Sequence, residues 1–389
     1  MRLLHTGDWH VGKVLRGVPR LEEHRRVLAE MVQLTADEGI DAVVVAGDVF
    51  ESAAPTAEAQ ELAWSTLLAL RATGAEVVVV AGNHDPADTF DALGPVFAGS
   101  GVTLVGRPRR PAEGGVLERR IVRTGELLRM ALLPFVSQRG IVKAADLLAL
   151  DAAAHLGAYR ARYAAVIAAL CRDFTPDAVN VVVAHATVTG ARFGGGEREA
   201  QSVFDYSIDA LCFPPAASYV ALGHLHRSQL VAGPCPVWYS GSPLAVDFGE
   251  AANTPGVLVV DGAPGRPARV RAVPIGAARG LREVRGTVAE LTARAAAGEF
   301  GDDLLKVVVA EAACAGLADA VRAVLPHAVE VRVAPMDAEV AVPATPPVAG
   351  RRSPQELFAA FLAQQHVVDG RLEALFAELL DDEIARERS

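Results

Sequence analysis

The sequence predicts an α/β protein of two or three domains, built on parallel strands that helices cover. Two observations support this prediction. Short apolar runs rich in β-branched residues alternate with helix-like segments over the first 80 residues, a pattern typical of βαβ units. In addition, the chain has 389 residues, which is more than one hydrophobic core usually serves.

The composition describes a folded, globular protein and excludes several other classes. Hydrophobic residues make up 51% and charged residues 22% of the chain, unlike the composition of a disordered protein. No apolar stretch approaches the roughly 20 residues of a membrane span, and the first residues lack an apolar signal region. The four cysteines are scattered, without a CxxC pair, so we expect free thiols in a cytoplasmic protein with no membrane partner.

The net charge of −10 argues against a broad basic face that grips nucleic acid. It does not exclude the hydrolysis of phosphodiesters, because bound divalent cations supply strong local positive charge. The overall charge therefore leaves a nucleic-acid substrate open.

Capping residues and apolar spacing predict the first helices. We expect one helix over residues 21–38, between the first two strands, and a second over 56–73 with Thr56 as its N-cap. Short strands broken by Pro, Gly and Arg follow over 102–136. A long alanine-rich helix then spans about 144–172.

The middle of the chain predicts a second sheet and a domain boundary. No GK[ST] motif follows the glycine-rich stretch 192–198, so we interpret it as a mobile surface loop rather than a phosphate-binding loop. Two later segments, 238–243 and 256–260, suit a second sheet. The stretch 264–278 is rich in Pro, Gly and Arg, and we take it as the end of a first domain at 1–278.

Two further units follow the boundary. Strands and helices alternate over residues 281–333, which predicts a small α/β domain at 279–342. A proline-rich linker leads to a tail at 343–389, where Ser353 and Glu356 form a capping box. Apolar residues at helical spacing follow in the tail, so we expect amphipathic helices that pack on the protein or on a partner.

Five apolar strands each end in Asp, Asn or His. In layered α/β proteins, ligands bind at the carboxyl ends of strands, whereas a single Asp there would more simply be a turn or cap residue. Five such coincidences favour one common site. Its candidate residues are Asp8, His10, Asp48, Asn83, His185, His224 and His226.

These seven side chains suit a pair of divalent metal ions. Oxygen and imidazole donors without thiolates favour Mn²⁺, Fe²⁺ or Zn²⁺ over Mg²⁺. Asp48 is the natural bridge between two ions, which at about 3.5–4 Å apart can activate a water and stabilise the oxygens of a phosphoryl displacement. His84 directly follows Asn83, and we expect it to contact the scissile phosphate or the leaving oxygen. We interpret the remaining histidines as core or solvated residues: His5, His24, His155, His327 and His366.

The motifs at the strand ends resemble a known family. About the first 260 residues are similar to the calcineurin-like metallophosphoesterases, through Gly7-Asp8-Trp9-His10, Gly47-Asp48, Gly82-Asn83-His84-Asp85, His185 and Gly223-His224-Leu225-His226. Within that family, four segments, 5–13, 47–50, 221–226 and 239–243, resemble bacterial nuclease subunits that work with an SbcC-type coiled-coil ATPase. The resemblance implies a double-sheet sandwich flanked by helices, a small α/β capping domain, a helical C-terminal tail and that ATPase as partner. It also implies a homodimer within a heterotetramer.

The resemblance further implies how the ligands divide between two ions, expected to be Mn²⁺, with Mg²⁺, Fe²⁺ or Zn²⁺ as alternatives. One ion would take Asp8, His10, Asp48 and His226. The other would take Asp48, Asn83, His185 and His224, with His84 acting on the phosphate. Archaeal and eukaryotic members have a histidine just after the bridging aspartate, where this chain has Phe50-Glu51-Ser52.

The sequence therefore predicts a metal-dependent DNA nuclease, a double-strand exonuclease and a single-strand and hairpin endonuclease that serves DNA repair, recombination and replication. The alternatives are a small-nucleotide phosphodiesterase or phosphatase, which would have no obvious use for the capping domain and tail, and a scaffold without activity. All ligand positions hold competent residue types, which disfavours the scaffold. The candidate DNA contacts lie on loops near the strand ends: Lys13, Arg16, Arg192 and Arg198.

Overall fold

The computed structural model describes most of the first 334 residues and a few positions beyond them. The described residues are 1–137, 141, 159–197, 207–334 and the single positions 358, 362, 371, 372 and 376. The chain divides into two compact units, Met1–Ala334 and Pro335–Ser389. The predicted tail helices, the first half of the helix predicted over 144–172, and Arg198 lie outside the described residues, apart from those single tail positions.

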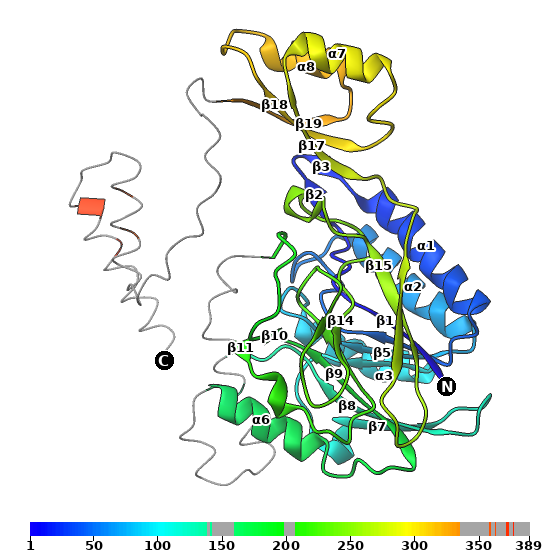
Figure 1. The fold of residues 1–389 in the computed structure, drawn as a ribbon. Coiled ribbons are helices and arrows are strands. Elements are labelled where there is room, and N and C mark those ends of the chain that lie inside the picture. Colours follow the sequence, from blue (N-terminus) through cyan, green and yellow to red (C-terminus); the bar gives the residue numbers. More distant parts are fainter. Residues whose placement is uncertain are drawn as a thin grey trace. The chain divides into compact units, whose positions relative to one another are not determined.

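The first sheet has six strands, with four parallel strands in its centre and at one edge (Figure 1). In spatial order these are β16 (Arg269–Pro274), β15 (Gly256–Asp261), β1 (Arg2–Thr6), β4 (Ala42–Val45), β5 (Glu76–Val80) and β6 (Val102–Val105). β1, β4, β5 and β6 are parallel, as the alternating pattern predicts. β15 pairs antiparallel with β1, and β16 pairs antiparallel with β15.

The placement of β15 corrects one prediction. The strand predicted over 256–260 joins the first sheet rather than the second, because it pairs with β1 in a register that sets Leu258 opposite His5. β15 is apolar on both faces, which suits a place between two buried layers. The edge strand β16 lies in the stretch 264–278, at the end of the first domain predicted at 1–278.

The second sheet also has six strands, four of them parallel. In spatial order these are β13 (Gln229–Val231), β14 (Val237–Tyr239), β12 (Tyr219–Gly223), β9 (Ala178–His185), β8 (Leu127–Leu133) and β7 (Val116–Arg120). β14, β12, β9 and β8 are parallel, and the two edge strands are antiparallel to their neighbours.

The two sheets pack face to face, with helices on the outside. Alternate residues of each central strand face the other sheet, so that Val44 and Val78 share one apolar cluster with Val181 and Ala221. The helices α1 (Leu21–Asp37), α2 (Ala57–Ala72) and α3 (Ala87–Gly99) cover the outer face of the first sheet, and α6 (Tyr159–Leu170) covers that of the second. This confirms the double-sheet sandwich flanked by helices. The Thr56 cap is also confirmed, since its side chain accepts the backbone N–H of Ala59.

A small α/β unit follows the sandwich, and strands and helices alternate in it over residues 281–333 as predicted. Three parallel strands lie in the order β17-β18-β19 and pack with two helices around one apolar core. The elements are β17 (Leu281–Gly286), α7 (Val288–Ala296), β18 (Leu304–Val309), α8 (Leu317–Val324) and β19 (Ala328–Val333). Leu281 and Leu304 of this domain also pack with Leu15, Ala245 and Phe248 of the sandwich.

Short elements complete the described part of the chain, within which no helix is long and apolar enough to cross a membrane. They are the hairpin β2 (Val14–Leu15) and β3 (Val18–Pro19), the parallel pair β10 (Thr187–Val188) and β11 (Ser207–Ile208), and the 3-10 turns η1 (Pro111–Glu113), η4 (Ala210–Cys212) and η5 (Phe248–Glu250).

Candidate active site

The strand ends of both sheets bring all seven predicted ligands together. Four of them follow strands of the first sheet, namely Asp8 and His10 after β1, Asp48 after β4 and Asn83 after β5. The other three belong to the second sheet, where His185 ends β9 and His224 and His226 follow β12. Apart from Asn83, which is half-buried, each of these side chains is almost inaccessible to solvent. The site therefore lies at the carboxyl ends of parallel strands, where α/β folds bind their ligands.

The backbone is strained at four of these positions. Asp8, His10, Asp48 and His224 have positive φ angles of 51°, 50°, 49° and 104°. Residues other than glycine seldom adopt this conformation. Among the described non-glycine residues only Arg16 shares it. Such strain persists where the surrounding structure imposes it, and it gathers at functional sites.

Two motif glycines let the ligand loops approach closely. A Cβ at Gly82 would lie 2.7 Å from Cγ of Asp48 and would overlap its backbone nitrogen. A Cβ at Gly47, whose φ is +96°, would lie 2.8 Å from Cγ of His185. Neither position can therefore take a side chain without moving a candidate ligand.

Gly82→Ala is expected to lower both stability and metal affinity, because the new methyl group displaces Asp48. Overpacking of this kind costs about 1–3 kcal/mol. The measurements are the melting temperature and the affinity for Mn²⁺. Gly99→Ala is the matched control, since nothing lies within 4 Å of a Cβ built there. Equal metal affinities in the two variants would contradict this reading of Gly82.

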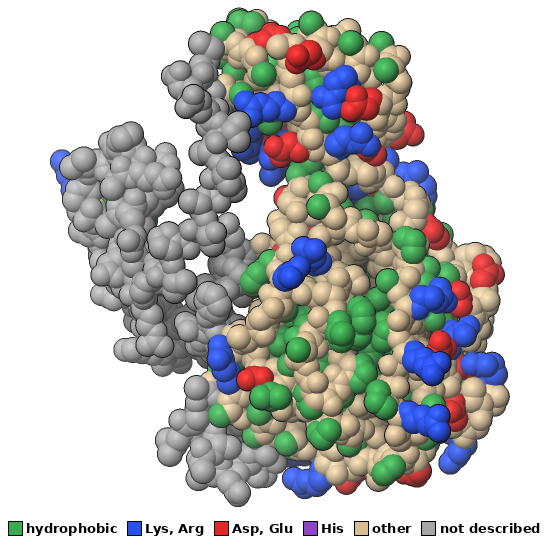
Figure 2. Space-filling view, in the orientation of Figure 1, with side chains coloured by type: hydrophobic (Ala, Val, Ile, Leu, Met, Phe, Trp, Pro, Cys, Tyr) green, Lys and Arg blue, Asp and Glu red, His purple; other side chains and the backbone are tan. Residues whose placement is uncertain are grey.

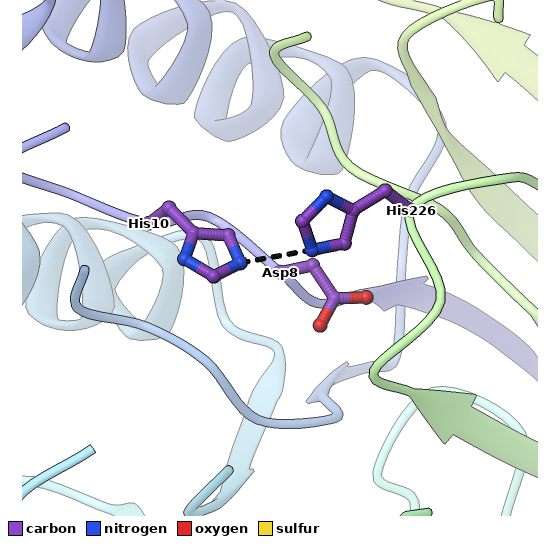
Figure 3. Close-up of side chains that lie close together, drawn as sticks. All are labelled: Asp8, His10 and His226. Atoms are coloured by element: carbon purple, nitrogen blue, oxygen red, sulfur yellow. Dashed lines mark hydrogen bonds between the residues drawn. The ribbon is translucent and has the colours of Figure 1, made fainter. Parts of the chain in front are cut away.

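The ligand atoms form two clusters. The first cluster consists of Asp8, His10 and His226, and the second of Asp48, His185 and His224, each with ligand atoms within 4.8 Å of one another. In the first, Nε2 of His10 lies 3.0 Å from Nε2 of His226 (Figure 3). In the second, Nε2 of His185 lies 3.4 Å from Oδ2 of Asp48. Oδ1 of Asn83 lies 2.9 Å from both His185 Nε2 and His224 Nδ1.

His84 lies beside both clusters. Its ligand atoms fall within 4.8 Å of those of His10 and Asp48. Its backbone N–H donates to Oδ1 of Asp48 at 2.9 Å, and its Nδ1 lies 2.7 Å from the carbonyl oxygen of Glu51. Because Nδ1–H donates to that carbonyl, Nε2 is left for the recess that His84 lines together with His10 and Asp48.

Buried charges of opposite sign stabilise one another at this site. Burial alone would lower the pKa of His185, but the carboxylate of Asp48 outweighs it and raises that pKa to about 9. Burial likewise disfavours the charge of Asp48, yet the charges of His185, His10 and His84 hold its pKa well below the ordinary value. Burial raises the pKa of Asp8 to about 7. Buried carboxylates and imidazoles that converge in this way fit divalent cations.

Several carboxylates that support the site were not predicted. Asp85 accepts the backbone N–H groups of Gly82 and Phe50 at 2.8 and 2.9 Å, and so holds the Asp48 and Asn83 loops together. Its place in the GNHD motif was the available signal. Glu51 and Glu250 contact the outer ring nitrogens of His10 and His226. No local pattern marks these two residues.

The glycine-rich stretch corrects another prediction as far as residue 197. It is anchored against the site rather than a mobile surface loop, because the carboxylate of Glu197 accepts three backbone N–H groups. Those of Gly194, Gly195 and His226 lie 2.6, 2.7 and 2.9 Å away. Glu197 therefore forms part of the wall of the recess.

The candidate DNA contacts have different surroundings. Lys13 lines the recess and lies 3.0 Å from Glu51. Arg16 instead pairs with Glu330 of the small domain at 2.6 Å. Arg192 is exposed. His5 and His24 are buried among structural hydrogen bonds, as the sequence predicts.

Comparison with known proteins agrees with this geometry. The family model for calcineurin-like phosphoesterases matches residues 1–228. The chain belongs to this family of metal-dependent phosphoesterases.

Similarity to curated relatives assigns the chain to one group within this family. The chain is 36% identical over 270 residues to the SbcD subunit of the nuclease SbcCD from Bacillus subtilis, covering 69% of this chain and 68% of the relative. It is 36% identical over 283 residues to that of Rhodobacter capsulatus (69% and 68%) and 31% identical over 303 residues to that of Escherichia coli K12 (76% and 73%). The chain is thus a member of the SbcD group of nucleases. A crystal structure of a dimetal phosphatase from Danio rerio, at 11% identity and a TM-score of 0.39, covers 71% of this chain and 99% of that chain.

Proposed function

We propose that the chain is a metal-dependent DNA nuclease that hydrolyses phosphodiesters with two Mn²⁺ ions. The proposal rests on the convergence of seven oxygen and imidazole donors, six buried and one half-buried, from the ends of five strands. Four of them, His10, Asp48, His224 and His226, line one recess. The relatives are named nucleases. We further propose exonuclease action on double strands and endonuclease action on single strands and hairpins, in DNA end processing and repair.

The donors would divide into two ion positions that share Asp48. Asp8, His10 and His226 would complete one position, and Asn83, His185 and His224 the other. When bound, two divalent ions activate a water and neutralise charge on the phosphate oxygens. Outer hydrogen bonds fix several ligand rings, as between His185 Nδ1–H and the carbonyl oxygen of Ala46 at 2.8 Å.

His84 is placed to act on the phosphate. Its Nδ1–H is held by the carbonyl of Glu51, and its ring packs edge-on against His10 with centroids 4.8 Å apart. In the imidazolium form, Nε2–H can donate to a phosphate oxygen or to the leaving oxygen. The ring is therefore oriented before the substrate arrives.

Lys13 and Arg192 are the proposed phosphate contacts, with Arg198 as a candidate outside the described residues. Arg16 was predicted in the same role, but its pair with Glu330 favours a role in joining the small domain to the sandwich. On the face that Figure 2 shows, Lys and Arg side chains are scattered among Asp and Glu. We therefore expect the isolated chain to bind DNA weakly, and we expect the partner to provide much of the affinity for DNA.

We propose an SbcC-type coiled-coil ATPase as that partner, in a heterotetramer that contains a homodimer of this chain. We divide the chain into three parts, at 278/279 and at 342/343. We propose that the last part, the tail at 343–389, docks the ATPase. A cytoplasmic location is proposed because all four cysteines are free.

Deleting residues 351–389 is expected to abolish co-purification with the ATPase and ATP-stimulated duplex digestion. Apolar helix faces that bind a groove are a common recognition mode, and each buried Leu or Phe contributes about 1.5–3 kcal/mol before ordering costs. Metal content, melting temperature and hydrolysis of short single strands should be nearly unchanged. Full-affinity capture of the ATPase by the truncated chain would contradict the docking role of the tail.

The test of the function is nuclease activity on DNA with defined ends, with and without the ATPase and ATP, in the presence of Mn²⁺. We expect hydrolysis of single strands by the chain alone and stimulated duplex digestion by the complex. Hydrolysis of a chromogenic phosphodiester without any action on DNA would favour the small-nucleotide phosphodiesterase. No hydrolysis of either substrate would favour the scaffold.

A further inference from the structure

The two clusters differ in the groups that face the outer nitrogens of their histidines. In the first cluster, Nδ1 of His10 lies 3.0 Å from Oε2 of Glu51. Both atoms are buried, the contact between them is not aligned as a hydrogen bond, and neither atom has a hydrogen-bond partner in the described part of the chain. Each is therefore the close polar neighbour of the other.

Glu51 is itself held in place. Its other carboxylate oxygen, Oε1, lies 3.0 Å from Nζ of Lys13. Its backbone N–H donates to the carbonyl of Val11 at 3.2 Å, and its carbonyl accepts from His84 at 2.7 Å. Contacts on both its side chain and its backbone thus fix the carboxylate behind His10.

The other histidine of the first cluster is also backed by a carboxylate, and in this case the contact is a hydrogen bond. Nδ1 of His226 lies 2.6 Å from Oε1 of Glu250. Glu250 is 1% exposed, and its Oε2 accepts the backbone N–H of Val246 at 2.9 Å. A Cβ at Gly196 would lie 2.8 Å from Cδ of Glu250, so the backbone packs directly on this carboxylate. Both imidazoles of the first cluster are therefore backed by an acidic side chain.

In the second cluster, His185 has a neutral group at the corresponding position. Nδ1 of His185 faces the carbonyl oxygen of Ala46 at 2.8 Å. His224 points Nδ1 itself at the amide oxygen of Asn83. The ligand sets differ in the same sense, because Asp8 adds a carboxylate to the first position where Asn83 adds an uncharged amide to the second.

We infer that Glu51 and Glu250 are positioning residues that make the first cluster the tighter of two unequal metal positions. The inference rests on the proposed function, which supplies the two ions. A carboxylate behind an imidazole fixes its tautomer and raises the basicity of the ligating nitrogen. Each negative charge near the site also strengthens the attraction of a dication. Outer partners of this kind are typically worth about 10–100-fold in metal affinity.

The test is a calorimetric titration of the metal-stripped full-length chain with Mn²⁺. We expect two binding steps in the wild-type protein. Glu51→Gln and Glu250→Gln keep the side-chain shape and remove the charge, and each should weaken the tighter step by about 10–100-fold while leaving the weaker step within threefold. Glu118→Gln is the matched control, because Glu118 pairs with Arg129 on β7 and β8, away from the site.

Asn83→Ala should do the reverse and weaken only the second step. Unchanged tight binding in both glutamine variants, or equal weakening of both steps, would overturn the inference while two bound ions still supported the proposed function. A wild-type chain that binds no Mn²⁺ would overturn the proposed function and the inference together. Glu250 is buried and Glu51 is half-exposed. If one of the two glutamine variants fails to fold, the other still tests the inference.

Discussion

Asp48→Ala is expected to remove bound metal and abolish hydrolysis. Oδ2 of Asp48 lies 3.4 Å from Nε2 of His185 and 3.8 Å from Nε2 of His10, so one carboxylate faces a histidine of each cluster. Its Oδ1 also accepts the N–H of His84. Losing it should lower activity by more than the roughly 10²–10³-fold that follows the loss of a single preorganised hydrogen-bond donor.

The measurements for Asp48 are the metal content after gel filtration and the rate on a chromogenic phosphodiester. Asp48→Asn keeps the shape of the side chain and should fail in the same way, since it loses the charge that both positions share. Asp261→Ala is the control, because this exposed carboxylate pairs with Arg2 at the opposite end of β1. Two retained ions in either Asp48 variant would show that Asp48 is not the shared ligand.

His84→Ala should lower the rate by about 10²–10⁴-fold, the usual contribution of a positioned acid–base group. The protein should keep both metal ions, because the ring is held by the carbonyl of Glu51 and its Nε2 faces the recess. The rate on short single strands and the metal content are the two measurements.

His327→Ala, in the small domain, is the control for His84. The geometry also allows His84 as a ligand, since its ring lies within ligand distance of His10 and Asp48. Loss of one ion on replacement of His84, with His327→Ala unchanged, would show that His84 is a ligand and contradict its assignment to the phosphate.

The ligands could be predicted from sequence because their signal is local. An apolar run followed by Gly-Asp or Gly-Asn-His predicts both a buried strand and the candidate ligand at its carboxyl end. The α/β architecture then brings these strand ends together. The small domain was predicted for the same reason, because strand-like and helix-like segments alternate over residues 281–333. The structure adds a capping box at Thr287, where the helix beginning at Val288 starts.

The features that were not predicted correctly depend on long-range packing. α3 contains Gly94 and Pro95, which obscure a helical pattern, and yet it packs Phe90 and Phe97 into the core. The sequence of β15 has the apolar pattern of a buried strand in either sheet. Its sheet is determined by its pairing with β1. Glu250 contacts His226 across 24 residues of chain, so neither spacing nor periodicity marks it.

The central claim is that the active chain holds two divalent ions at one site. The most direct test is to reconstitute the metal-free protein with increasing Mn²⁺ and to follow bound ions and hydrolysis of a short single strand in the same samples. We expect little activity at one ion per chain and full activity only as the second ion binds. Full activity at one bound ion per chain would contradict it.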